Sequence, residues 1–81
     1  MDTANWKSPI TIEDPETGTR RTVRSVRQAK TVLDRFWPSY HGSQYERAEH
    51  VCDEALKGEV EPVKARQAFI SAAAEAHLHF L

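Results

Sequence analysis

Alternating apolar and polar residues near the start of the chain predict a β-hairpin. Ile10 and Ile12 alternate with polar neighbours, and Val23 stands among threonines and arginines. Pro15 and Gly18 lie between these segments, and such residues favour a turn because proline fixes φ and glycine readily adopts positive φ. We therefore predict two short antiparallel strands joined by a loop of roughly five residues.

The segment after the second strand has the spacing of an amphipathic helix. Ser25 and Gln28 stand three positions apart, as in a capping box at a helix start. Pro38 disfavours helical geometry at Trp37, so we expect the helix to end there. The apolar residues recur every three or four positions and would share one face: Val26, Ala29, Val32, Leu33 and Phe36.

The same criteria predict two more helices. The second would begin with a Ser43–Glu46 capping box and end at Gly58, a residue type suited to a left-handed helix terminus. Pro62 suits the first turn of the third, where its missing N–H would have no helical partner. We expect apolar residues on one side of the third helix as far as Phe80. The predicted fold class is therefore α+β, with an N-terminal two-stranded antiparallel hairpin followed by three α-helices (ββααα).

Length and composition indicate one small domain over residues 1–81, with residues 1–5 as a flexible tail. The single cysteine, Cys52, cannot form an internal disulfide, which favours a reducing compartment. No apolar run approaches the ~20 residues of a membrane-spanning helix. The N-terminus also lacks the basic and apolar regions of a signal peptide. We expect a cytoplasmic protein that does not associate with membranes.

Several segments together resemble a known family. These are Trp6, the hairpin, "SVRQA", "FWP", "YERAEHVCDEALKG" and "ARQAFISAAAEA". In this order they resemble domain-of-unknown-function family 982, small bacterial proteins of about this length, over roughly residues 6–77. The resemblance implies a compact α+β domain that stands alone and has no established activity. It offers no catalytic residues to carry over.

No motif in the sequence indicates an enzyme, a metal site or a cofactor. Cys52 is predicted to lie on the apolar face of the second helix, and His50, two positions earlier, would point almost the opposite way. The chain has no metal-ligand spacing, nucleophile motif or glycine-rich phosphate loop. We therefore expect no catalytic residues, no metal and no cofactor.

Charge is distributed unevenly along the chain. Residues 19–35 hold six basic side chains and one acidic one, whereas residues 44–61 hold six acidic and two basic ones. One interpretation is a basic patch that binds nucleic acid or an acidic protein partner. The other is that these elements pack together and neutralise each other, with Lys30 and Asp34 paired at i,i+4. The basic segment contains no aromatic residue for base stacking, so we favour neutralisation or a protein partner over nucleic acid. The residues concerned are Arg20, Arg21, Arg24, Arg27 and Lys30.

Arg66 is predicted to lie on the inward face of the third helix. An unpaired guanidinium there would be costly, so we expect a structural ion pair with Glu49 or Asp53. The alternative is an anion or small-molecule pocket formed by Arg66, His77 and Trp37.

Three hypotheses for function follow. The leading one is a small non-enzymatic interaction or regulatory module that binds a protein partner or a second copy of itself, with Trp37 and Tyr40 as further contact residues. Strand-edge pairing would relieve the unpaired edges of a hairpin. The second is a nucleic-acid accessory protein that uses the arginine cluster. The third is a small-anion or small-molecule binder around Arg66.

Overall fold

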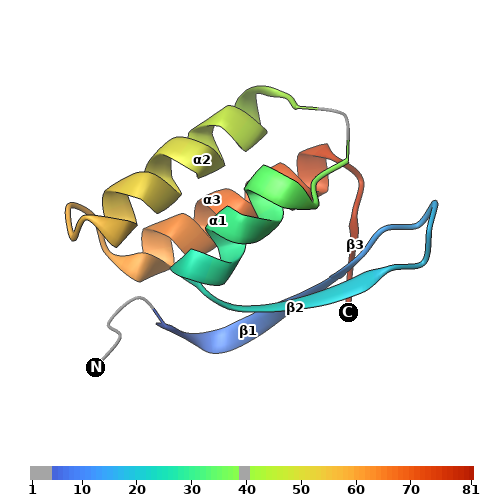
Figure 1. The fold of residues 1–81 in the computed structure, drawn as a ribbon, viewed down its shortest axis with the longest axis horizontal. Coiled ribbons are helices and arrows are strands. Elements are labelled where there is room, and N and C mark those ends of the chain that lie inside the picture. The colour runs from blue at the N-terminus through green and yellow to red at the C-terminus, as the bar shows by residue number, and fades with distance from the viewer. Residues whose placement is uncertain (1–4, 39–40) are drawn as a thin grey trace.

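The computed structural model describes residues 5–38 and 41–81, and it has the predicted α+β architecture with one additional strand (Figure 1). The elements in chain order are β1 (Asn5–Glu13), β2 (Arg20–Ser25), α1 (Val26–Arg35), α2 (Ser43–Leu56), α3 (Pro62–Glu75) and β3 (His79–Phe80). The helices all lie on one side of the sheet. α1 packs on β2 and α3 packs on β1, whereas α2 lies over α1 and α3 on the side away from the sheet.

The sheet is antiparallel with strand order β2-β1-β3. Ile10, Ile12 and Val23 are buried against the helices, as their alternation with polar residues predicts. Thr11 and Thr22 face the opposite way, and their hydroxyl groups are hydrogen-bonded across the strands at 3.0 Å. The sheet therefore has an apolar inner face and a polar outer face that needs no covering layer.

The prediction that α3 continues to Phe80 is wrong. The helix ends at Glu75, and His77 has a left-handed backbone conformation with φ of 59°. The Leu78 N–H donates to the Ala73 carbonyl at 3.0 Å, and the Leu78 side chain is buried. This turn reverses the chain and brings Phe80 opposite Ile12 as part of β3.

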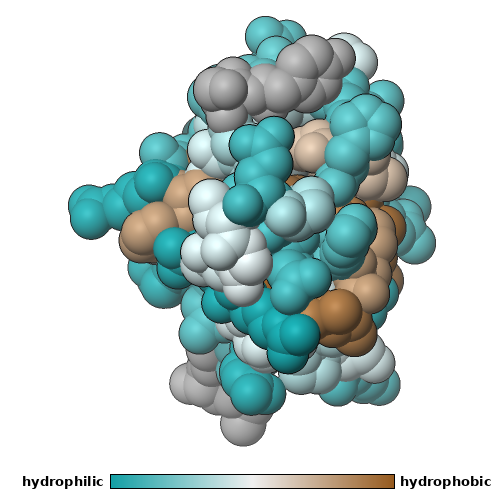
Figure 2. Space-filling model, turned by 90° about the vertical axis from the view of Figure 1, so that its right-hand side faces the viewer, coloured by the Kyte–Doolittle hydropathy of each residue, from teal (hydrophilic) through white to brown (hydrophobic). Residues whose placement is uncertain are grey.

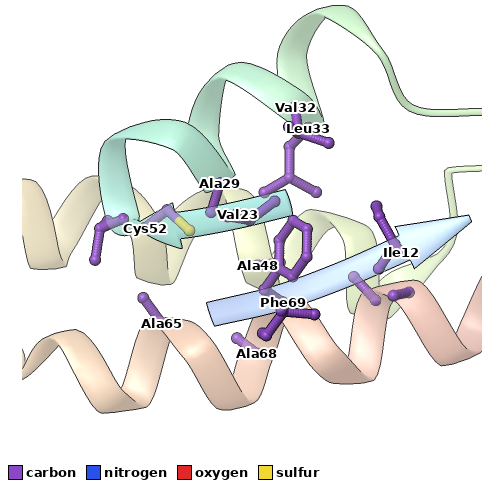
Figure 3. Packing of buried hydrophobic residues seen from close by; sticks show 14 of the residues in the cluster. Ile12, Val23, Ala29, Val32, Leu33, Ala48, Cys52, Ala65, Ala68 and Phe69 are labelled. Carbon is purple, nitrogen blue, oxygen red and sulfur yellow. The ribbon is translucent and has the colours of Figure 1, made fainter. Parts of the chain in front are cut away.

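The core lies between the sheet and the helices, with Phe69 at its centre. This side chain is fully buried and projects from α3 between the helices and the sheet (Figure 3). Its ring packs against Trp6 and Trp37, with centroids 6.1 and 5.5 Å away. Small residues line the contact between α2 and α3, which lets the two backbones approach closely. Those that are buried there are Ala48, Cys52, Ala55, Ala65, Ala68 and Ala72.

The roles predicted for Phe36 and Trp37 are reversed. Phe36 is 49% exposed, whereas Trp37 packs against the core and contacts Tyr45 as well as Phe69. α1 ends at Arg35, and Phe36 already has non-helical dihedral angles (φ −128°, ψ 15°). Helical spacing therefore no longer decides which way these two side chains point.

One predicted capping box is confirmed in its serine half, because the Gln28 side chain accepts from the Arg24 N–H rather than from that of Ser25, and the other box is wrong. The Ser25 hydroxyl accepts from the Gln28 N–H at 3.2 Å, as predicted for α1. At the start of α2 the cap residue is Gly42, and the Ser43–Glu46 capping box does not form. Instead, the Glu75 carboxylate at the end of α3 accepts from the N–H groups of Gln44 and Tyr45 at 3.1–3.2 Å. A negative charge at a helix N-terminus is also electrostatically favourable.

Gly42 makes this arrangement possible. A Cβ atom at this position would lie 2.5–2.6 Å from the carboxyl atoms of Glu75. Any side chain at residue 42 would therefore compete with Glu75 for the same space.

Across the described residues, no helix is both long enough and apolar enough to cross a membrane.

Candidate functional site

A groove between β2 and α1 brings together much of the predicted arginine cluster. We call it the basic groove; it has a volume of about 430 Å³. Its floor and walls come from the edge strand and from the flank of the helix that covers it. The lining residues are Arg20, Arg21, Thr22, Arg27, Gln28, Thr31, Val32 and Phe36. Arg24 is not a lining residue, but it belongs to the same strand, β2, and is exposed.

Two of the basic residues predicted to bind a partner, Arg20 and Lys30, are neutralised by acidic side chains of the fold. Arg20 forms an ion pair with Glu13 across the hairpin, with Nε and Oε2 3.0 Å apart. Lys30 points to α2, where its Nζ lies 2.8 Å from Glu49 and 3.4 Å from Asp53. The predicted Lys30–Asp34 pair is confirmed at 3.5 Å. The expectation that the basic segment and the acidic segment 44–61 neutralise each other therefore holds for Lys30, whereas Arg20 is paired with Glu13 of β1, outside that segment.

The pKa values of Lys30 and Glu49 in this α1–α2 contact are shifted because several charged groups lie close together and are partly buried. Burial alone would lower the pKa of the Lys30 ammonium, but the Glu49 hydrogen bond and the surrounding carboxylates raise it above its usual value. Burial and the neighbouring Asp34 raise the pKa of Glu49, against the lowering effect of Lys30. The ion pairs of Lys30 therefore hold α1 against α2.

Three arginines remain for other contacts. Within residues 5–38 and 41–81, no carboxylate lies within ion-pair distance of Arg21, Arg24 or Arg27. All three belong to β2 or to the first turn of α1. The basic groove and its rim therefore carry positive charge that the described part of the chain does not neutralise.

An aromatic ring adjoins these arginines. The Arg21 guanidinium carbon lies 3.7 Å from the centre of the Phe36 ring, a cation–π contact. Sequence reasoning missed this pairing because it assigned Phe36 to the buried face of α1. The signal available was Pro38, which ends the helix early enough to release Phe36 from that face.

The end of the molecule that carries the hairpin turn is largely polar. Figure 2 shows apolar residues at the left and along the right of this face, with hydrophilic and intermediate residues between them. Charge and hydrogen bonding, rather than a broad apolar surface, are therefore available for recognition on this face.

Of the two predicted aromatic contact residues, the structure describes Trp37. Trp37 is packed against the core, and its buried Nε1 has no hydrogen-bond partner among the described residues. Tyr40 lies outside the residues that the structure describes.

Arg66 lies in a separate groove of about 580 Å³ between β1 and the start of α3. Its Nε donates to the Ser8 carbonyl at 3.0 Å, so the predicted ion pair with Glu49 or Asp53 is wrong. Those two carboxylates are already paired with Lys30. The lining residues are Asn5, Trp6, Lys7, Ser8, Glu61, Pro62, Val63 and Arg66. The structure therefore does not place His77 or Trp37 beside Arg66 in this groove.

Cys52 is a core residue, as predicted. It is fully buried, whereas His50 is exposed and faces Glu54 at 3.6 Å. No group of three histidine, cysteine or acidic side chains in residues 5–38 and 41–81 is arranged to hold a metal ion. Burial, reinforced by the nearby Glu49 carboxylate, raises the pKa of the Cys52 thiol to about 12.

This shift makes the fold sensitive to alkaline pH. Above a pH of about 9 the unfolded chain releases the thiol proton and the folded chain retains it, so stability falls as pH rises. We expect this group to contribute a loss of about 2 kcal/mol in the free energy of unfolding between pH 8 and 10.5. Urea unfolding of the wild type and Cys52→Ala at both pH values measures it, because the variant retains every other titrating group. Equal losses in the two proteins would show that Cys52 is not responsible.

Comparisons with known proteins agree with the fold. The family described as "Protein of unknown function (DUF982)" matches residues 8–80. The NMR structure of the Agrobacterium tumefaciens protein Atu1219, a structural-genomics target, is 32% identical, with a TM-score of 0.76. The match covers 94% of this chain and 75% of that one. A comparison with curated proteins finds no match. The family match over residues 8–80 includes nearly all of the fold described above, and the chain therefore belongs to the DUF982 family of proteins of unknown function.

Proposed function

We propose that this protein is a non-enzymatic interaction module that binds an acidic segment of a partner protein through the basic groove. The observation that carries the proposal is the set of three arginines, Arg21, Arg24 and Arg27, that no described carboxylate neutralises. Arg21 and Arg27 line a groove of about 430 Å³ that also includes the exposed ring of Phe36, and Arg24 is exposed on the same strand as Arg21. Complementary charge favours both the encounter with such a segment and its orientation.

A second candidate function is nucleic-acid binding, favoured by the contact between Arg21 and Phe36. Proteins that bind single strands combine basic side chains with aromatic stacking surfaces. Two features favour a protein partner instead. Arg21 already covers one face of the Phe36 ring, and the net charge of −1 gives no general attraction to a polyanion.

Charge reversal on the groove tests the proposal. The probe is a blocked heptapeptide in which glutamate alternates with valine, and calorimetric titration gives its Kd. We expect the double variant Arg24→Glu, Arg27→Glu to bind about tenfold more weakly or worse, because two attractions become repulsions. Both side chains are exposed, and an acidic residue in the first turn of α1 is compatible with the helix dipole.

Arg47→Glu provides the matched control, since Arg47 is an exposed arginine on α2, away from the groove. Its variant should bind the peptide as the wild type does. A ten-residue oligothymidylate is titrated in parallel. Tighter binding of the oligonucleotide than of the peptide, lost in the double variant, would replace the proposal with the second candidate. Equal peptide affinity for all three proteins would contradict the proposal, and equal oligonucleotide affinity for all three would contradict the second candidate.

A further inference from the structure

β2 is an edge strand, and the direction of its backbone groups can be deduced. The Thr11 carbonyl accepts from the Leu81 N–H at 2.9 Å, so the backbone groups of Thr11 face β3. Thr22 is the residue opposite Thr11 in the β1–β2 ladder. Opposite residues in an antiparallel ladder either both face each other or both face away. The N–H and C=O of Thr22 therefore point to the open edge of the sheet.

The same alternation applies to the neighbouring residues of β2. Arg20 and Arg24 stand two positions from Thr22, so their backbone groups also face the open edge. The Arg24 N–H is occupied by the Gln28 side chain, whose Oε1 accepts from it at 2.6 Å. Gln28 thus closes the edge at the start of α1. Among residues 5–38 and 41–81, nothing pairs with the outward backbone groups of Arg20 and Thr22, so they are available for pairing.

The corresponding edge of β1 is protected. β3 covers only Ile12 and Glu13, but the register of β1 is irregular between Asn5 and Ile10. Pro9 in this stretch has no N–H, and Arg66 occupies the Ser8 carbonyl. Bulges and prolines are common means of blocking an edge strand. The edge of β2 has no such irregularity from Arg20 to Val23.

The basic groove lies beside this same edge. α1 covers the inner face of β2, and Thr31, Val32 and Phe36 form the wall of the groove above it. A strand added next to β2 would lie about 4.8 Å from it. Alternate side chains of that strand would enter the groove, and the others would lie on the outer face beside Arg20 and Arg24.

We propose that the partner segment binds as an added β-strand along the open edge of β2, with its backbone paired to Thr22 and its acidic side chains beside the arginines. The inference rests on the function proposed above and adds the binding mode. Complementary charge selects this occupant. A second copy paired antiparallel through Thr22 would place Arg24 of each copy opposite Arg20 of the other, so it would bring no carboxylate to Arg24.

Two substitutions at Thr22 separate strand addition from attraction by charge alone. Thr22→Pro removes the outward N–H, and because that group does not pair with β1, the hairpin ladder remains complete. Thr22→Val keeps the N–H and, like the proline variant, lacks the hydroxyl that contacts Thr11. We expect the proline variant to bind the glutamate–valine heptapeptide about five- to tenfold more weakly than the valine variant. Circular dichroism and thermal unfolding establish that both are folded.

A second measurement on the wild type does not depend on the proline variant. The Thr22 amide proton faces solvent in the free protein, and saturating peptide should slow its hydrogen exchange at least tenfold. The Thr31 amide in α1 serves as the internal reference. If the peptide binds and the Arg24→Glu, Arg27→Glu variant does not, but Thr22 exchange is unchanged, strand addition is wrong and the proposed function stands. If no protein binds the peptide, the proposed function is wrong as well.

Discussion

Replacing Phe69 with alanine should lower the free energy of unfolding by about 3–5 kcal/mol. Among the residues that the structure describes, Phe69 is the largest fully buried side chain, and it packs against both Trp6 and Trp37. Its removal would leave a cavity between the sheet and the helices that small alanine side chains nearby cannot fill. A domain of 81 residues has a total stability of about 4–12 kcal/mol, so the loss is a large part of the whole. Urea unfolding followed by circular dichroism measures it.

Phe36→Ala is the matched control, because it makes the same chemical change at a half-exposed position. We expect it to cost at most about 1 kcal/mol, chiefly from the contact with Arg21. Phe69→Leu retains most of the apolar volume and should lose about 1–2 kcal/mol, which gives a measurable value if the alanine variant does not fold. Equal costs for Phe69→Ala and Phe36→Ala would contradict the placement of the two rings.

The second large effect concerns the cap that α3 provides for α2. Glu75→Ala should cost about 1–2 kcal/mol, because two N–H groups at the start of α2 lose their acceptor. Gly42→Ser should cost a similar amount in the wild type, since its Cβ would displace the Glu75 carboxylate. In the Glu75→Ala background the same serine should instead stabilise, because its hydroxyl can cap the helix in place of the carboxylate.

A double-mutant cycle measured by urea unfolding tests this coupling. The double variant should be about as stable as either single variant or more stable, rather than carrying the sum of both losses. Gly58→Ser offers a comparison, because no atom lies near its added Cβ but its φ is 80°. Its cost arises from backbone conformation and should not depend on residue 75. Additive losses at residues 42 and 75 would show that the two positions act independently.

The fold could largely be predicted from local patterns. The alternation of Ile10 and Ile12, the Ser25–Gln28 cap and Pro62 each report on the backbone within a few residues, and each agrees with the structure. β3 could not be predicted in this way. A strand of two residues is too short to show an alternation of apolar and polar positions. β3 forms because burial of Leu78 turns the chain back along β1.

The candidate site was only partly visible in the sequence. A cluster of arginines between residues 20 and 27 is apparent from the sequence alone. Which of its members are neutralised depends on contacts across the fold, such as that between Lys30 and Glu49. The proximity of Phe36 to Arg21 depends in turn on where α1 ends. The charge pattern of the sequence thus predicted where the basic surface lies. Which of its basic residues are neutralised, and that Phe36 lies beside Arg21, could be seen only in the tertiary structure.

The pairing of β1 with β3 has a consequence for the order of folding. The hairpin and the contacts between successive helices join segments that are close in sequence, so they can form early and quickly. The Ile12–Phe80 pairing joins two segments separated by nearly the whole fold. During synthesis, β1 must wait for this partner until all three helices have left the ribosome. Until then the nascent chain exposes one more strand edge than the finished protein, and this is the interval in which unwanted strand pairing is the greatest hazard.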